Sequence, residues 1–439
     1  MTKEELAKAF GAADITSKAM QNAMSDWYEL YYGGNAEEED PCQEIPYTVV
    51  QKLSKTAFSE YDATSENDFA QGVLNALDRV RKNAMQKTLI GGECRLKPVP
   101  GKTGFRFAVV DRRNMMVFGR NMDGDITDLG TWEESTFGNL YYTLLERRTV
   151  DDSGYLRILN TLYCSKTKEK LGDPVPLESN PRYEGMENEY IYREPVGSIG
   201  MAALRVPMVN CVDGSADAVS VYAKAARLIH NINRNEYQLN GEFQRAESRI
   251  IVSDDLLDDK KLKDHVFVGL DDDPDDVGVT IFSPEIREQS FLARKKEYLR
   301  NVESVIGLKR GLLSEIEAVE RTATEITSSE GDYALTISEL QEAWEEAVRE
   351  CVRLCGIFGR LYNVPGTAEV KPEDISLDFG NGILYDKDAT WQDYKDMVAR
   401  GLLKPEIAVA WKFGMPHETP EDLAAVREKY MPELENLLA

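Results

Sequence analysis

The chain has 439 residues with 77 acidic and 52 basic side chains, which gives a formal net charge of −25 at pH 7. This acid excess argues against a dedicated nucleic-acid binder, because affinity for a phosphate backbone comes mostly from counterions released by Lys and Arg. The length allows two to four domains, and 42% hydrophobic residues suffice for packed cores.

The sequence predicts a soluble protein made in the cytoplasm. Residues 1–6 (MTKEEL) lack the basic and apolar regions of a signal peptide. No stretch approaches the roughly 18 uncharged apolar residues that a membrane span needs. Six cysteines without a CxxC spacing indicate neither a disulfide scaffold nor a zinc site. Cys351 and Cys355 lie one helical turn apart and are expected to be small residues of the hydrophobic core.

The N-terminal part of the chain is predicted to be helical. Residues 1–40 suggest an amphipathic helix that passes through the aromatic run 27–32 and stops at Gly33-Gly34. From Asn67 to Leu89 apolar residues recur at helical spacing, which predicts one helix that ends at Gly91-Gly92.

A β-rich stretch is expected to follow, between residues 93 and 171. Short alternating runs at 105–109 and 115–118 are separated by turns such as Asp123-Gly124, and residues 155–163 alternate again. An antiparallel sheet is the natural interpretation of this pattern.

Two long helices flanking a small insert are predicted next. Residues 216–247 carry one apolar face at helical spacing. Residues 249–252 and 277–282 predict two strands on either side of a charged loop. Ser283 as N-cap and Pro284 at the first helical position predict a second helix that runs to Gly307.

The C-terminal part is predicted to be mostly helical. After a connecting stretch at 308–321, a long helix is expected from Thr322 to Leu361. Residues 375–379 and 383–385 predict a hairpin that turns at Gly380-Asn-Gly382. An all-helical tail follows, with Thr419 as a predicted N-cap.

No motif nominates a catalytic residue, a cofactor site or a metal site. Residues 100–103 (PGKT) resemble the end of a P-loop but have Leu96 where a Gly is needed. Residues 123–134 imitate a calcium loop but have Asp128 at the position of the required Gly. The acidic run 271–276 is typical of a solvated loop. Carboxylate pairs leave no local signature, so an enzyme with a carboxylate-based site in the β-rich body stays an alternative.

Several segments together resemble one family, the portal proteins of tailed double-stranded-DNA phages, of the type found in phages and prophages of Gram-positive bacteria. The similarity runs over nearly the whole chain, and its most specific segment is Arg321–Ile326 (RTATEI), which leads into the long helix. The other matching segments are Trp27–Gly34, Ile90–Gly92, Tyr141–Glu146, Leu156–Asn160, Leu171–Leu177, Gly214-Ser215, Gly401–Glu406 and Pro420–Glu433.

The resemblance implies an α+β portal architecture: a β-rich wing, long stem helices, a small α/β clip and a helical crown, in a subunit that forms rings of typically twelve copies. The implied parts are the wing (1–215), stem helices (216–247 and 284–306), clip (248–283), tunnel loop (307–324), long helix with return hairpin (325–388) and crown (389–439).

The resemblance also implies a function and a set of partners. The ring would occupy one capsid vertex of the virion and would be the channel for double-stranded DNA during packaging and ejection. It would contact the terminase large subunit, the head–tail adaptor, and the major capsid and scaffolding proteins, with no membrane, cofactor or catalytic activity. Another capsid or head-completion protein is the nearest structural alternative.

The charges are polarised along the implied stem and clip. Residues 248–283 contain 10 acidic and 4 basic side chains, whereas residues 284–310 contain 4 acidic and 7 basic ones. We hypothesise that some of these basic residues face the channel or the adjacent subunit, namely Arg287, Arg294, Lys295, Arg300, Lys309 and Arg310. Pairing with carboxylates of the clip or of a neighbour is the alternative. The DNA-channel candidates are Arg294, Arg300, Lys309, Arg310 and Arg321. The clip candidates facing terminase or adaptor are Asp254, Asp255, Asp271, Asp272 and Asp273.

Overall fold

The computed structural model describes residues 1–33, 41–245, 249–253, 266–269, 279–282, 286–314, 323–380, 387–413, 415–416 and 419–431. They form a mixed α+β fold, which confirms the predicted fold class. The chain divides into two compact units. Unit 1 comprises Met1–Phe58 and Ala63–Leu377, and unit 2 comprises Ser59–Asp62 and Asp378–Ala439.

Three N-terminal helices begin unit 1: α1 (Lys3–Phe10), α2 (Lys18–Tyr32) and α3 (Ile45–Ala57). A capping box fixes the start of α1, because Thr2 accepts from the Glu5 amide while the Glu5 carboxylate accepts from the Thr2 amide. Helix α2 ends at Gly33, whose φ of 61° suits glycine, so the predicted stop is confirmed.

The single helix predicted over 67–89 is wrong, because the segment forms two helices, α4 (Asp68–Asp78) and α5 (Arg81–Gly91). The Val80 amide bonds to the Leu77 carbonyl, three residues back, which closes a tight turn between them. Helix α4 packs on the strand β3 (Gly104–Asp111), whereas α5 packs on α3. Because of this break, the apolar residues of the two helices pack against two different elements, although they follow one helical pattern in the sequence.

Antiparallel strands follow, as the alternating runs predicted, but they form two sheets where one was expected. The smaller has the order β10-β2-β3, and the larger has the order β4-β5-β6-β7-β8, with β9 also paired to β7. Their bounds are β2 (Glu93–Gly101), β4 (Met115–Arg120), β5 (Ile126–Phe137), β6 (Leu140–Val150), β7 (Leu156–Ser165), β8 (Asp173–Val175), β9 (Glu189–Ile191) and β10 (Ala202–Arg205). Residues 100–103 lie at the β2–β3 hairpin turn.

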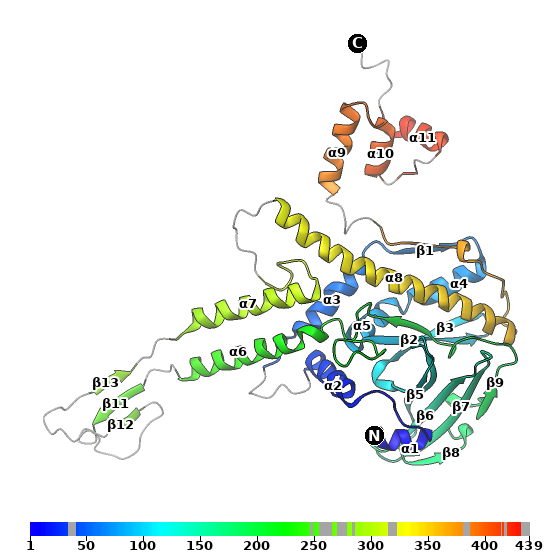
Figure 1. The fold of residues 1–439 in the computed structure, drawn as a ribbon, viewed down its shortest axis with the longest axis horizontal. Coiled ribbons are helices and arrows are strands. Elements are labelled where there is room, and N and C mark those ends of the chain that lie inside the picture. Colours follow the sequence, from blue (N-terminus) through cyan, green and yellow to red (C-terminus); the bar gives the residue numbers. More distant parts are fainter. Residues whose placement is uncertain are drawn as a thin grey trace, which may run out of the picture. The chain divides into compact units, whose positions relative to one another are not determined.

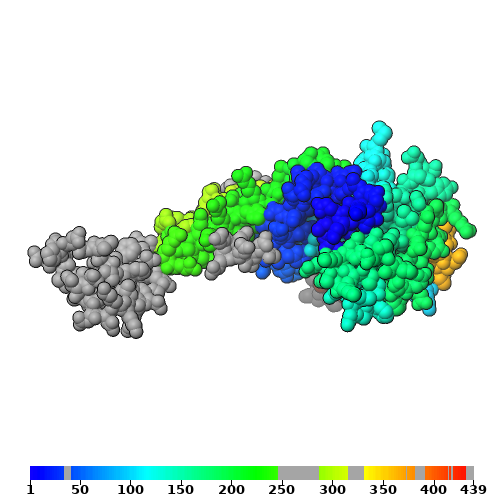
Figure 2. Space-filling view, turned by 90° about the horizontal axis from the view of Figure 1, so that it is seen from below, coloured from blue at the N-terminus to red at the C-terminus, as the bar shows by residue number. Residues whose placement is uncertain are grey.

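Helix α1 covers part of the larger sheet. Leu6 and Phe10 pack with Met116, Leu145 and Leu171 in one buried cluster. In Figure 2 the N-terminal residues (blue) lie against the β-rich part (green). Short 3-10 helices complete this region: η1 (Arg112–Asn114), η2 (Leu177–Ser179), η3 (Pro181–Tyr183), η4 (Ala223–Ala225) and η6 (Pro372–Asp374).

Helices α6 (Ala226–Arg245) and α7 (Glu288–Ile306) run side by side (Figure 1), and the Asn235 side chain donates to the Phe291 carbonyl at 3.1 Å. The helix predicted to begin at residue 216 begins ten residues later. Residues 218–222 are buried instead in an irregular segment, where the Val221 amide and the Ser220 hydroxyl both donate to the Leu89 carbonyl. The predicted N-cap Ser283 lies outside the described residues, but the predicted helix start at Pro284 is wrong, because α7 begins at Glu288 with Arg287 as its N-cap.

The insert between α6 and α7 contains a three-stranded sheet. Strands β11 (Arg249–Ser253) and β13 (Val279–Phe282) pair antiparallel, which confirms the two predicted strands. Strand β12 (Val266–Gly269) pairs parallel to β11. It was missed because its four residues (VFVG) show no alternation.

Helix α8 (Ala323–Leu361) is the longest helix described and matches its prediction closely. Its Trp344 is fully buried and meets the Phe58 ring edge-on at 5.4 Å. Cys351 and Cys355 are buried as expected. Strand β14 (Ile375–Asp378) pairs with β1 (Asp62–Ser65). The predicted hairpin partner, 383–385, lies outside the described residues.

Unit 2 contains the helices α9 (Lys387–Ala399), α10 (Pro405–Phe413) and α11 (Pro420–Tyr430). The predicted N-cap is confirmed, because Thr419 and Asp422 form a capping box at the start of α11. Arg427 Nε donates to the Glu406 carboxylate at 2.9 Å and ties α11 to α10. None of the helices in the described ranges combines the length and the apolar composition that crossing a membrane requires.

Candidate functional site

Several basic side chains in and next to the α6–α7 pair contact carboxylates of the same chain. Lys295 donates to Glu236 at 2.7 Å and to the Gln43 side chain at 2.9 Å. Arg287 of the segment before α7 pairs with Glu242. Both carboxylates belong to α6, so at these two positions the pairing lies within the α6–α7 region, and not with residues 248–283 or a neighbour as the alternative had it.

Of the predicted DNA-channel candidates, Arg294 is also engaged within its helix. Its guanidinium pairs with Glu297 at 2.7 Å and lies 4.4 Å from the centre of the Tyr298 ring. Arg300, Lys309 and Arg310 have exposed side chains near and after the end of α7. Arg321 lies outside the described residues, as do all five clip candidates, Asp254, Asp255, Asp271, Asp272 and Asp273.

A buried carboxylate organises the segment that carries Lys309 and Arg310. Glu303 near the end of α7 is fully buried. Its Oε1 accepts from the backbone amides of Gly311, Leu313 and Ser314 at 3.1, 2.6 and 2.9 Å, and its Oε2 accepts from the Ser314 hydroxyl at 2.8 Å. Hydrogen bonds to an ionised acceptor are among the stronger ones in proteins.

The consequence is a loop of fixed shape. Gly307 ends α7 with a φ of 77°, and Leu308 is buried beside it. Lys309 and Arg310 then lie between this buried anchor and the amides held by Glu303. The two cationic side chains are therefore displayed on an ordered turn, where less conformational entropy is lost on binding.

A second buried charge cluster lies in the β-rich part. Glu93, the first residue of β2, is fully buried and faces Arg95 at 3.1 Å, Arg205 at 3.2 Å and Arg112 at 3.3 Å. Burial alone would raise the pKa of Glu93, but Arg95, Arg205 and Arg112 outweigh it and lower that pKa to about 2. Glu93 is therefore ionised at neutral pH.

The cluster continues through a second carboxylate. Asp217 lies 2.7 Å from Arg120 and 3.4 Å from Arg112. Four guanidinium groups are thus linked to two buried carboxylates, Glu93 and Asp217. Burial lowers the pKa of Arg95, Glu93 opposes that shift, and the neighbouring guanidiniums add to it.

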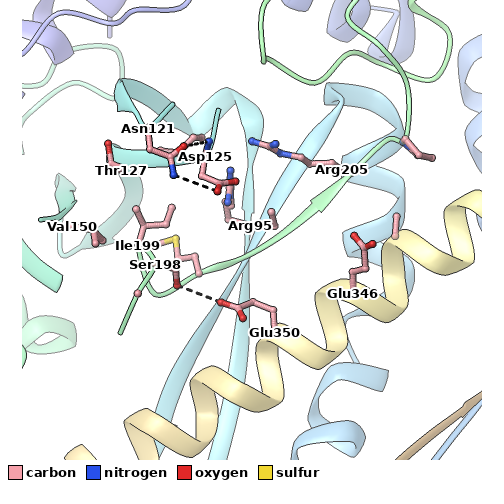
Figure 3. Close-up of a pocket in the computed structure, with 16 residues that line it drawn as sticks. Arg95, Asn121, Asp125, Thr127, Val150, Ser198, Ile199, Arg205, Glu346 and Glu350 are labelled. Atoms are coloured by element: carbon pink, nitrogen blue, oxygen red, sulfur yellow. Dashed lines mark hydrogen bonds between the residues drawn. The ribbon is translucent and has the colours of Figure 1, made fainter. Parts of the chain in front are cut away.

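The cluster borders a polar cavity of about 470 Å³ (Figure 3). Arg95, Arg205 and the β4–β5 turn lie on one side of the cavity. Glu346 and Glu350 of α8 lie on the other side. The Asn121 side chain fixes the turn by accepting from the amides of Asp123 and Asp125 at 3.1 and 2.7 Å. The charged and amide residues that line the cavity are Arg95, Arg205, Asn121, Asp125, Glu346 and Glu350.

A larger cavity of about 860 Å³ lies between β2–β3, β5–β7 and the end of α8. Glu146 is one of the residues that line this cavity, and it pairs with Lys97 at 2.6 Å and with Arg148 at 2.7 Å. Burial opposes the ionisation of Glu146, but these two cations lower its pKa to about 2. Tyr192 and Tyr362 also line this cavity, and their hydroxyl oxygens lie 2.7 Å apart.

The described residues contain no group of three or more His, Cys, Asp or Glu side chains placed to hold a metal ion. His230 lies 2.7 Å from Asp26 on another helix. The calcium-like run 123–134 begins in the β4–β5 turn and continues along β5. Glu93 and Glu303 were not found from the sequence, because a single Glu among 77 acidic residues gives no sign of being buried.

No family model matches the sequence, and no curated protein matches it either. Solved structures do match. One of them, titled "Neck of native GTA particle computed with C12 symmetry", is aligned over 93% of this chain and 97% of that chain, at 12% identity and a TM-score of 0.47. A likeness at this level decides nothing about function.

Proposed function

We propose that this chain is the portal subunit of a tailed double-stranded-DNA phage or prophage. Rings of about twelve copies would sit at one capsid vertex and pass DNA inward during packaging and outward during ejection. The role is that of a conduit and docking platform without catalysis, and the terminase large subunit supplies the motor.

The order of parts along the chain carries this proposal. A β-rich body leads into the paired helices α6 and α7, which flank a small three-stranded insert. The loop held by Glu303 follows, then the 39-residue helix α8 and a separate helical unit. This is the succession wing, stem, clip, stem, tunnel loop, long helix and crown that the sequence resemblance implies.

The parts receive roles on that basis. Residues 248–283 would be the clip, whose acidic side chains face terminase and adaptor. Lys309 and Arg310 would belong to the tunnel loop with Arg321, where they contact DNA. Major capsid and scaffolding proteins would surround the wing. A mostly acidic wall with few basic positions repels phosphate, so DNA slides rather than binds.

The purified protein is expected to form rings. Twelve copies of 49.5 kDa give a native mass of about 600 kDa. Native mass spectrometry measures this mass, and negative-stain images should show a central hole. A monomer or dimer at micromolar concentration would contradict the proposal and would favour an enzyme with a carboxylate-based site in the β-rich body.

Removing the two cations of the ordered loop should impair DNA passage without disturbing assembly. Each basic contact adds a salt-sensitive increment of interaction with phosphate. The double variant Lys309→Ala/Arg310→Ala is expected to form rings but to package DNA roughly severalfold less efficiently than the wild type. The matched control is Lys166→Ala/Lys168→Ala, two exposed lysines after β7. Normal packaging by the loop variant would remove both residues from the channel.

A further inference from the structure

We propose that the cavity beside Arg95 and Arg205 is a docking site for a second copy of this chain, which inserts a carboxylate side chain between the two guanidiniums. The inference rests on the ring proposed above and names a contact within it. Neither the sequence motifs nor the channel candidates point to this part of the molecule.

The first observation is that both arginines have donors to spare. Arg95 uses one terminal nitrogen on Glu93 at 3.1 Å, and Arg205 uses Nε on the same carboxylate at 3.2 Å. Among the described residues, the other guanidinium nitrogens of both side chains have no hydrogen-bond partner. Arg95 is only 5% exposed, and its Nε is buried and has no hydrogen-bond partner among the described residues. Buried donors of this kind normally have acceptors.

The second observation is an imbalance of charge. Four guanidiniums (Arg95, Arg112, Arg120, Arg205) share two buried carboxylates, Glu93 and Asp217. Counted by direct contact alone, the guanidiniums outnumber the carboxylates, so a further anion would be stabilised at the face that opens into the cavity. A carboxylate could be this anion, because it would accept charge-assisted hydrogen bonds from both Arg95 and Arg205.

The rim of the cavity limits what this anion can belong to. Asp125, Glu346 and Glu350 line the same space, and Glu346 has no ion-pair partner among the described residues. They would repel a nucleic-acid backbone, which brings many negative charges. A polypeptide segment can bring one carboxylate for the arginines together with a basic side chain for Glu346. Helix α7 shows that this chain presents such patterns, since Arg294 and Glu297 are both exposed on it.

The third observation is an apolar border. Met122, in the β4–β5 turn, is fully exposed, and Val209, two residues beyond the lining residue Pro207, is 89% exposed. Large apolar side chains at the edge of a polar pocket are typical of protein interfaces rather than of ion sites. A ring requires a heterologous contact between two different faces of each copy, and this border with its unpaired arginines can supply one of them.

Photo-crosslinking tests the contact without disturbing the fold. Benzoylphenylalanine is placed singly at Val209 or Met122 in the full chain, and at Ile191 as a matched exposed position on β9. Irradiation of the assembled protein should give covalent dimers from positions 122 and 209. Mass spectrometry should find an Asp or Glu in the linked segment of the second copy.

A charge variant gives the second readout. Arg205→Gln leaves Arg95 and Arg112 on Glu93, so the subunit is expected to fold. Its subunits should associate about tenfold or more weakly than wild type, because a buried pair loses one partner. Arg157→Gln, whose exposed pair with Glu189 measures 2.7 Å, is the control and should assemble normally.

The outcomes separate the two proposals. Rings that give no inter-copy crosslinks from positions 122 and 209, or that assemble equally well with Arg205→Gln and Arg157→Gln, overturn the docking site and leave the ring intact. Binding of inorganic phosphate to Arg205 in rings that show no such crosslinks assigns the cavity to a free anion and overturns it as well. A wild-type chain that stays monomeric refutes the proposed function itself.

Discussion

Glu93→Gln is expected to lower the free energy of unfolding by about 3–5 kcal/mol, the largest effect of any single substitution considered. Glu93 is fully buried between three guanidiniums, at 3.1 to 3.3 Å. The neutral amide would leave Arg95, Arg112 and Arg205 close together with no charge between them. Urea denaturation followed by circular dichroism measures the loss.

The control for this variant is Glu189→Gln, which breaks an exposed pair with Arg157 and should change stability by no more than about 0.5 kcal/mol. The pH dependence follows from the lowered pKa of Glu93. Its contribution is present above the ordinary value of 4.5 and is lost as the pH falls towards about 2. Glu93→Gln should therefore flatten the decline in stability between these pH values, and an unchanged decline would contradict the assignment.

Glu303→Ala is expected to release the loop after α7. The substitution removes the acceptor of three backbone amides and one hydroxyl, so the unfolding free energy should fall by about 3 kcal/mol or more. Limited proteolysis is a more specific readout than the global stability, because Lys309 and Arg310 are exposed trypsin sites on the loop that Glu303 holds. Limited proteolysis should cut the variant after these residues well before the wild type.

Glu297→Ala is the matched control on the same helix, since Glu297 is exposed and forms an ion pair with Arg294 of α7. It should change stability by no more than about 0.5 kcal/mol and should not alter the cleavage pattern. Equal cleavage rates in Glu303→Ala and wild type would show that the carboxylate does not hold the loop. Glu303→Gln keeps the side-chain volume and one acceptor, so its cleavage rate should lie between the two.

Features encoded by neighbouring residues could be predicted from the sequence. The end of α2 at Gly33, the capping box at Thr419 and the long helix α8 each depend on residues close together in the chain. The antiparallel meander from β4 to β7 follows from alternation and turn residues for the same reason. Local propensity and tertiary structure agree in these elements.

The failures come from contacts between distant residues. Residues 218–222 have a helical pattern, but they are drawn into bonds with Leu89 and stay irregular. Strand β14 pairs with β1, which precedes it by more than three hundred residues. The buried roles of Glu93 and Glu303 depend on arginines and amides that only the fold brings together. The cavity beside Arg95 and Arg205 could therefore not be predicted from the sequence.

The pairing of β1 with β14 has a consequence for synthesis on the ribosome. The Ser65 hydroxyl donates to the Asp374 carbonyl at 2.6 Å, so an early segment is completed by one of the last parts of unit 1. At translation rates of roughly 5–20 residues per second, β1 waits roughly 15–60 seconds for its partner. During that interval its edge and the surface later covered by α8 are exposed to other nascent chains. Chains that meet during that interval are therefore at risk of aggregating, which favours completion of each chain before it meets another.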